Sequence, residues 1–195
     1  MLLTTLAQQC APQVAPSTLA AIVQMESGGN PWVLWDNTAH RGYHPQTRKG
    51  AERILRVLMA EGHQVDVGIA QVDTVNFAAY GLRPATAFDA CTNLRVGAEI
   101  LAADYRQATT TYGPGQTALY HAFEAYNSGR LHGDSGYANR ILTAAGVPVR
   151  VSVAGALSWR HRSNAPMVFV ETWGTTKPGS APKAEKAAMV YALNW

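Results

Sequence analysis

The sequence predicts a mainly α-helical domain with a small irregular or β-hairpin wall and an extended C-terminal tail. Residues 32–48 interrupt the helical pattern with tryptophan, glycine and proline, and valines alternate with other residues from 147 to 153. We expect a helical domain over residues 1–146, and an extended segment, a linker and an apolar end over residues 147–195. The predicted helices, in which apolar residues recur every three or four positions, cover 3–10, 16–26, 51–60, 92–107, 117–127 and 134–146.

Composition excludes several classes of protein. The 195 residues are 47% hydrophobic and 15% charged, which is typical of a globular protein. The net charge is +3, but basic residues are scattered and no basic-aromatic motif appears, so we expect no nucleic acid partner. No apolar run reaches the ~18–20 residues of a transmembrane helix. The six histidines are scattered, and His40 and His44 lack a zinc-protease pattern, so we expect no metal and no cofactor.

The segment from Leu19 to Pro31 places a carboxylate in an unusual position. Leu19, Ile22 and Val23 form an apolar stripe on the predicted helix, and Glu26 falls on the same stripe. Gly28 and Gly29 follow, so Glu26 lies in the last helical turn. Desolvation and the negative end of the helix dipole would both raise its pKa, as a general acid requires. The alternative is a solvated Glu26 at a frayed helix end.

Two later stretches add to this segment. Gly68-Ile69-Ala70-Gln71-Val72 and Ala125-Tyr126-Asn127-Ser128-Gly129 follow it in the chain. With Glu26-Ser27-Gly28-Gly29-Asn30-Pro31, they resemble the three motifs of lytic transglycosylases of the goose-lysozyme-like, soluble lytic transglycosylase superfamily. The chain looks most like the transglycosylase subunit of type IV secretion and conjugation systems, and the resemblance covers residues 1–146.

This resemblance implies a lysozyme-like fold and a peptidoglycan substrate. The bond cleaved would be the β-1,4 bond between N-acetylmuramic acid and N-acetylglucosamine, with a 1,6-anhydromuramyl product. Glu26 would be the catalytic acid, and the substrate-binding residues would be Ser27, Gln71, Tyr126 and Asn127. The enzyme would open the cell wall locally for an envelope-spanning apparatus, whose proteins are potential partners of the C-terminal segment.

Some residues also have structural interpretations. Tyr126 is equally suited to the core, with its hydroxyl bonded to backbone. Gly68 either allows close approach of a polysaccharide or is an ordinary turn glycine. Trp32 and Trp35 either stack on sugar rings or cover the edge of the core.

Asp73, directly after the middle motif, leaves the reaction class open. It is a possible second acid that holds a water molecule, as in goose-type lysozymes, which would make the protein a hydrolase. The alternative is an N-cap for the segment 74–79, because aspartate is a favoured capping residue. A non-catalytic peptidoglycan-binding scaffold is a third possibility, although it needs no buried acid at Glu26.

The resemblance also implies a periplasmic or exported protein. Met1-Leu2-Leu3 is too short for a secretory signal, so the signal was trimmed, begins upstream, or is replaced by another export route. Cys10 and Cys91 are the two cysteines, and an exported domain favours a disulfide between them. Two buried free thiols are the alternative.

Overall fold

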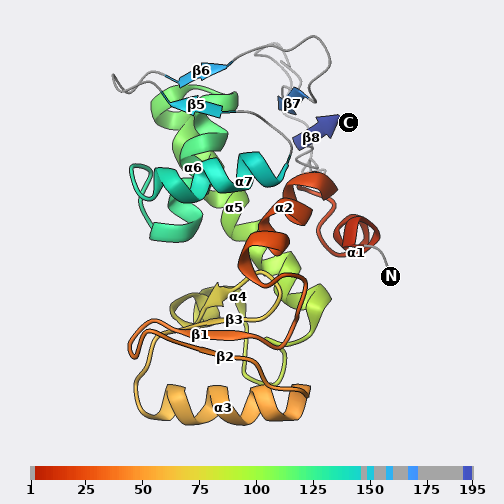
Figure 1. The fold of residues 1–195 in the computed structure, drawn as a ribbon, viewed down its shortest axis with the longest axis vertical. Coiled ribbons are helices and arrows are strands. Elements are labelled where there is room, and N and C mark those ends of the chain that lie inside the picture. Colours follow the sequence, from red (N-terminus) through yellow and green to blue (C-terminus); the bar gives the residue numbers. More distant parts are fainter. Residues whose placement is uncertain (1–2, 146–148, 152–156, 160–166, 171–190, 195) are drawn as a thin grey trace, which may run out of the picture. The chain divides into compact units, whose positions relative to one another are not determined.

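The computed structural model describes residues 3–145, 149–151, 157–159, 167–170 and 191–194 (Figure 1). The described chain is mainly α-helical, as predicted. Its helices are α1 (Leu3–Cys10), α2 (Pro16–Glu26), α3 (Arg48–Ala60), α4 (Phe77–Tyr80), α5 (Ala90–Tyr112), α6 (Gln116–Ser128) and α7 (Ser135–Ala144), with a 3-10 turn η1 (Thr74–Asn76). Its strands are β1 (Leu34–Asp36), β2 (Arg41–Tyr43), β3 (Val65–Val67), β4 (Val72–Asp73), β5 (Val149–Val151), β6 (Leu157–Trp159), β7 (Met167–Val170) and β8 (Tyr191–Asn194).

Two helices begin earlier than predicted because polar caps extend them. The Thr47 side chain accepts a hydrogen bond from the Gly50 N–H at 3.1 Å, so α3 begins at Arg48. Asp89 accepts from the Thr92 N–H at 2.8 Å, and α5 begins at Ala90. The apolar pattern misses such residues because helix ends are defined by capping hydrogen bonds.

The chain forms two compact units. The first comprises Met1–Ala11 and Ile22–Glu99, and the second Pro12–Ala21 and Ile100–Trp195. The predicted division at residue 146 follows a different boundary and stays a prediction.

The first unit contains the predicted wall, which is larger than a hairpin. Strands β1 and β2 pair as the expected antiparallel hairpin, and two further strands extend it in the order β2-β1-β3-β4. Helix α3 packs against β1 and β3 (Figure 1). The wall is therefore a four-stranded antiparallel sheet supported by an amphipathic helix.

The two faces of this sheet differ in character because side chains alternate along each strand. One face carries buried residues, namely Leu34, Asp36, Val65, Val67 and Val72. Asp36 is satisfied there by the His63 ring at 2.8 Å and by the N–H groups of Thr38 and Ala39. The opposite face carries Trp35 and two aspartates and is described with the site.

In the second unit, the predicted core residues of α5 and α6 are buried. Leu101 and Tyr105 on α5 and Leu119 and Phe123 on α6 are each at most 2% exposed. Asp134 caps α7 by accepting from the Tyr137 N–H at 3.0 Å.

The C-terminal segment includes two short antiparallel pairs, β5 with β6 and β7 with β8. The strand over 149–151 matches the predicted extended segment, and β8 belongs to the predicted apolar end. The predicted linker, residues 177–183, lies outside the described residues.

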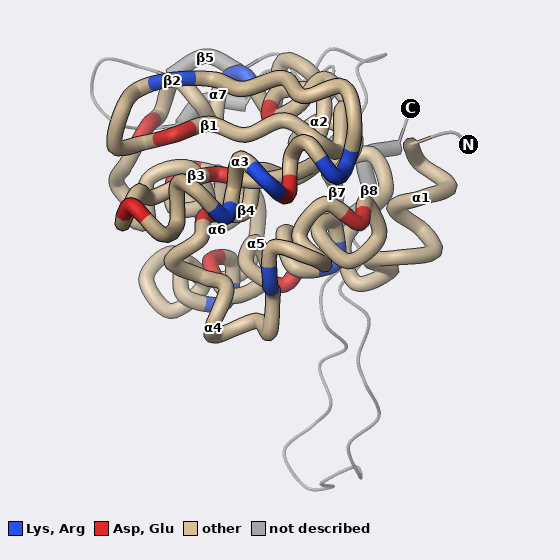
Figure 2. The backbone as a smooth tube through the Cα atoms, turned by 90° about the horizontal axis from the view of Figure 1, so that it is seen from below, with Lys and Arg blue, Asp and Glu red and all other residues tan. Residues whose placement is uncertain are grey.

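Basic and acidic positions are interspersed along the described backbone (Figure 2), as the scattered charges of the sequence indicate. Among the described helices, none combines the length and apolar character needed to cross a membrane.

Candidate active site

Glu26 is the last residue of α2, as predicted. Leu19, Ile22 and Val23 are each at most 1% exposed, so the predicted apolar stripe anchors this helix. Glu26, which follows the stripe, is half-buried. Its carboxylate therefore combines partial desolvation with access to a ligand, and it lies next to the carbonyls that end the helix. The catalytic role of Glu26 and its raised pKa stay predictions.

Ser27 ties the end of α2 to the middle motif. Its hydroxyl lies 2.7 Å from the Ile69 carbonyl and 3.2 Å from the Val23 carbonyl, and can donate to either. The same oxygen accepts from the Gly29 N–H at 3.2 Å. Residue 27 thus links two sequence motifs 42 positions apart, and it sets the position of its neighbour Glu26. Its predicted contact with substrate is untested, but this bridging role is visible.

Gln71 adopts an unusual backbone conformation. Its φ is +47°, a left-handed value that non-glycine residues adopt at an energetic cost and that occurs often at functional sites. Its side-chain nitrogen donates to the Gly68 carbonyl at 2.8 Å and to the Val33 carbonyl at 3.3 Å. These bonds hold the half-buried amide in one orientation.

Asn93, at the start of α5, organises the middle motif and was not identified as a site residue from the sequence. Its fully buried amide accepts from the Ala70 N–H at 2.8 Å and donates to the carbonyls of Val67 at 2.8 Å and Ala87 at 3.0 Å. A side chain that bonds three backbone groups positions the whole loop around Gly68.

A glycine is required at position 68 because Asn93 and Ala87 lie so close to it. Its φ is +83°, and a Cβ atom there would lie 2.6 Å from Asn93 Nδ2 and 2.9 Å from the Ala87 carbonyl oxygen. The structure thus shows a close approach between Gly68 and the protein's own Asn93. Close approach of a polysaccharide at Gly68 stays a prediction.

Asp73 acts as an N-cap, as one of the two interpretations predicts. One oxygen accepts from the Val75 N–H at 3.0 Å, at the start of the 3-10 turn η1. The other oxygen accepts from the Gln64 side-chain amide. Both carboxylate oxygens therefore have partners within the protein.

A row of four residues that was not predicted as a unit crosses the open face of the sheet. Gly42, Trp35, Asp66 and Asp73 are successive cross-strand partners, so their side chains lie on one face. The Trp35 ring is 42% exposed and lies over Gly42, with ring atoms 3.5 and 3.7 Å from a Cβ built at that glycine. We call these four residues the sheet row.

Asp66 is the electrostatically unusual member of the sheet row. Its pKa is raised to about 6, mainly by burial; a hydrogen bond from Asn37 at 2.9 Å lowers the pKa, and the charge of Asp73 raises it. Only the strand register reveals this pair of carboxylates, because the two residues are seven positions apart in the sequence.

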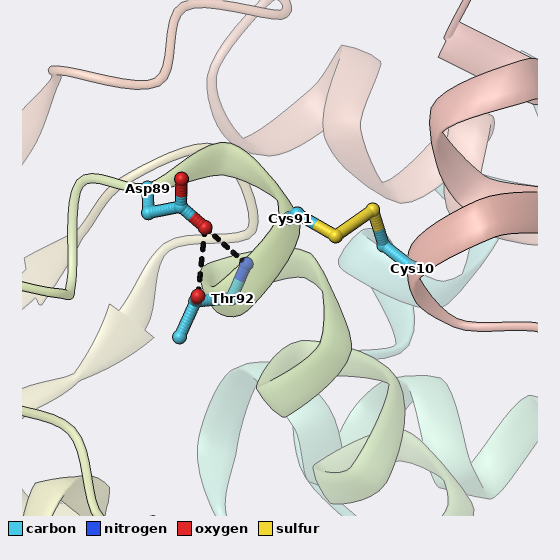
Figure 3. Close-up of a disulfide and its surroundings, with 4 residues drawn as sticks. All are labelled: Cys10, Asp89, Cys91 and Thr92. Atoms are coloured by element: carbon cyan, nitrogen blue, oxygen red, sulfur yellow. Dashed lines mark hydrogen bonds between the residues drawn. A yellow bond between two sulfur atoms is a disulfide. The ribbon is translucent and has the colours of Figure 1, made fainter.

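The predicted disulfide is confirmed. Cys10 on α1 and Cys91 on α5 are bonded, with Cα atoms 5.2 Å apart (Figure 3). Asp89 caps the same helical turn through both the N–H and the hydroxyl of Thr92, and these bonds lower the pKa of Asp89. The cross-link and the cap fix the turn that presents Asn93.

Tyr126 and Asn127 lie in the last turn of α6, within the second unit. Tyr126 is half-buried and Asn127 is exposed, and Gly129 ends the helix with φ +70°. The structure thus places both residues at a helix end, where a ligand can reach them. Their roles in substrate binding stay predictions.

Comparison with known proteins identifies a matching family and several relatives. A family model described as transglycosylase SLT domain matches residues 4–139, close to the 1–146 span of the resemblance. Protein virB1 of Agrobacterium fabrum strain C58 is 36% identical over 173 residues, which are 88% of this chain and 70% of that protein. The type IV secretion system protein virB1 of Brucella abortus biovar 1 is 43% identical over 129 residues.

The Brucella match covers 66% of this chain and 54% of that relative, so this chain spans about half of its length. Protein virB1 of Rhizobium radiobacter is 38% identical over 141 residues, covering 71% of this chain and 59% of that protein. No solved structure matches the chain significantly.

Proposed function

This chain belongs to the transglycosylase SLT domain family and is a lytic transglycosylase with a lysozyme-like fold, and we propose that its substrate is peptidoglycan. The bond cleaved is the β-1,4 bond between N-acetylmuramic acid and N-acetylglucosamine. The product carries a 1,6-anhydromuramyl end, because the attacking group is a hydroxyl of the same sugar and not water.

Glu26 serves as acid and then as base in this proposal. As a neutral carboxylic acid it donates its proton to the glycosidic oxygen, while positive charge develops at the anomeric carbon. The C–O bond breaks, and the muramyl 6-hydroxyl forms the new bond at the anomeric carbon. The Glu26 carboxylate takes the proton of that hydroxyl, which restores the enzyme without consuming water.

The main observation that supports the proposal is the hydrogen bond from the Ser27 hydroxyl to the Ile69 carbonyl, which we call the Ser27 bridge. The hydrogen bond from Ser27 to Ile69 holds the end of α2 against the loop that contains Gln71. A general acid acts efficiently only when it is fixed in one position relative to the substrate-binding groups. The bridge supports Glu26 as that acid, because it fixes the adjacent residue.

The arrangement of Asp73 favours transglycosylation over hydrolysis. A hydrolase of the goose-lysozyme type needs a carboxylate that activates the attacking water. Both oxygens of Asp73 accept hydrogen bonds from Val75 and Gln64, so its role as a cap is sufficient. We therefore propose that Glu26 is the one essential carboxylate.

The remaining predicted residues would bind the glycan. Gln71, Tyr126 and Asn127 offer uncharged groups suited to hydroxyl and acetamido groups. In the sheet row, the exposed Trp35 ring offers a flat apolar surface for a sugar ring, and Asp66 offers a hydrogen-bond acceptor beside it.

The biological setting is proposed from the relatives. One relative is named a type IV secretion system protein, and on this basis we propose that this chain opens the cell wall locally for a secretion or conjugation apparatus. Such a role places the enzyme in the periplasm, where the peptidoglycan lies. Envelope proteins of the apparatus are the partners we propose for the C-terminal segment.

The test is mass analysis of the products of digested peptidoglycan. We expect 1,6-anhydromuramyl ends from the parent and from Asp73→Asn, since asparagine also caps helices. Glu26→Gln keeps its shape but has no proton to donate, so activity should fall about 10²–10⁴-fold with the fold intact. Near-normal turnover by Glu26→Gln would refute the role of Glu26 as the general acid. Reducing ends that disappear in Asp73→Asn would establish a hydrolase.

A further inference from the structure

Two histidines and a glutamate gather in the second unit, and in the sequence they flank the motif over residues 125–129. One donor atom from each of His121, Glu124 and His132 lies within 4.8 Å of the other two. From the sequence we expected no metal, because the six histidines are scattered and His40 and His44 lack a zinc-protease pattern. We propose that this cluster binds one divalent transition-metal ion of the zinc class.

The first two donors are held rigidly by α6. His121 and Glu124 are three residues apart, so they share one face of the helix. The Glu124 side chain is only 6% exposed and that of His121 is 15% exposed. A buried carboxylate needs a compensating positive charge, which a divalent cation would supply more fully than one imidazole.

The His121 ring turns Nδ1 toward the rest of the cluster. Its Nδ1 lies 2.7 Å from Glu124 Oε2 and 2.8 Å from the Leu131 carbonyl oxygen. An ion that replaces the hydrogen between Nδ1 and Oε2 would therefore be bound by both of these donors. Tyr112 stacks on the ring at 4.1 Å and restricts its rotation.

The third donor is brought in by the loop after α6. The Ser128 hydroxyl lies 2.6 Å from the Glu124 carbonyl, to which it donates, and it accepts from the Arg130 N–H at 3.3 Å. A Cβ at Gly133 would lie 1.7 Å from Ser128 Oγ, so only glycine permits this path. His132, just before Gly133, is thereby held with its ring centre 5.0 Å from that of His121.

The distances require only a small closure. Ligands bound at 2.0–2.2 Å in a tetrahedral zinc site are about 3.4 Å apart. The donor atoms of the cluster lie within 4.8 Å of one another, so binding an ion requires them to close by up to about 1.4 Å. His132 is exposed and its ring contacts the Tyr112 hydroxyl at 2.7 Å, so it is the donor able to move. Two imidazoles and a carboxylate match zinc chemistry better than that of calcium.

The test is titration of the untagged, metal-stripped full chain with Zn²⁺ alone, by competition with a chromogenic chelator. Both cysteines are in the disulfide, so no thiol competes for the ion. We expect one ion per chain, no competition from Ca²⁺, and at least about tenfold weaker binding for His132→Ala and Glu124→Gln. His44→Ala, which removes an exposed histidine outside the cluster, should bind as the parent does.

A second readout uses Co²⁺, whose visible absorption reports tetrahedral nitrogen and oxygen ligation. Its bands should appear with the parent and vanish with His132→Ala, an exposed change whose fold can be verified by circular dichroism. Absence of stoichiometric Zn²⁺ binding, or equal binding by His132→Ala and the parent, would overturn the proposal. Neither measurement involves peptidoglycan, so its failure leaves the proposed function untouched.

Discussion

Asp66 shows how a single residue in the sheet row can oppose stability. Burial raises its pKa to about 6 from 3.8, so the folded state holds this proton more tightly than the unfolded chain does. Between about pH 4 and pH 6 the unfolded state ionises first, and the fold loses stability as the pH rises. The cost is complete above the folded pKa, at neutral pH. Residues kept despite such a cost are often functional.

We therefore predict that Asp66→Asn raises the melting temperature at pH 7.5 and leaves it unchanged near pH 4. The asparagine oxygen still accepts from Asn37, so the variant removes the charge and keeps this hydrogen bond. If Asp66 also binds glycan, the more stable variant should be less active. Thermal melts at both pH values provide the measurement.

Asp89→Asn is the matched control, because the charge of Asp89 stabilises the fold whereas the charge of Asp66 destabilises it. The hydrogen bonds from Thr92 lower the pKa of Asp89, so its charge stabilises the fold above the unfolded pKa, and this stability is lost as the pH falls. Asparagine keeps the cap, yet the melting temperature should fall at pH 7.5. A decrease for both variants at that pH would contradict the assignment for Asp66.

At the scale of elements, the loop from β3 to β4 depends on one contact between a glycine and α5. Gly68 has a left-handed backbone and no space for a Cβ, because Asn93 occupies that position. Asn93 in turn satisfies three backbone groups of this region. The middle motif and the start of α5 are thus one structural element, although they are far apart in the chain.

Gly68→Ala should be strongly destabilising, and Gly62→Ala is its matched control. Gly62 has φ +81°, nearly the value of Gly68, but nothing lies within 4 Å of its Cβ position. Backbone strain alone should cost Gly62→Ala about 1–2 kcal/mol of unfolding free energy. Gly68→Ala should cost several kcal/mol more and abolish cleavage. Equal losses in denaturant titrations would show that the Asn93 contact is unimportant.

At the scale of the whole molecule, the disulfide encloses most of the first unit. It joins residues 81 positions apart, from α1 to the start of α5. Closing so long a loop lowers the entropy of the unfolded chain. In the chain-entropy model this stabilises the folded state by about 4 kcal/mol. The same bond lies two residues from Asn93, so it also supports the loop that holds Gln71.

The double variant Cys10→Ser/Cys91→Ser should lose about 2–5 kcal/mol of unfolding free energy. Denaturant unfolding of the variant and of the parent, with and without reductant, gives the measurement. In reductant the parent should approach the variant. An unchanged midpoint for both would indicate that the cross-link is dispensable for folding.

The sequence alone determined the helical class, the order of the longer helices and the identity of the family. Periodic apolar residues require a buried face, and buried faces such as that of Leu19, Ile22 and Val23 can be recognised locally. The position of Glu26 at the end of a helix also follows from neighbouring residues, because capping involves groups within about four positions. The cap at Asp73 was one of two interpretations that the sequence left open. The cysteine pair was predicted correctly because the chain has only two cysteines.

Only the tertiary structure decided which distant groups meet. The Ser27 bridge to Ile69, the Asn93 contact with Gly68, and the placing of Asp66 beside Asp73 depend on strand register and loop paths. The cluster of His121, Glu124 and His132 likewise depends on the turn after α6. Local spacing carries no signal for such contacts, since their geometry arises when separate elements pack and exclude water.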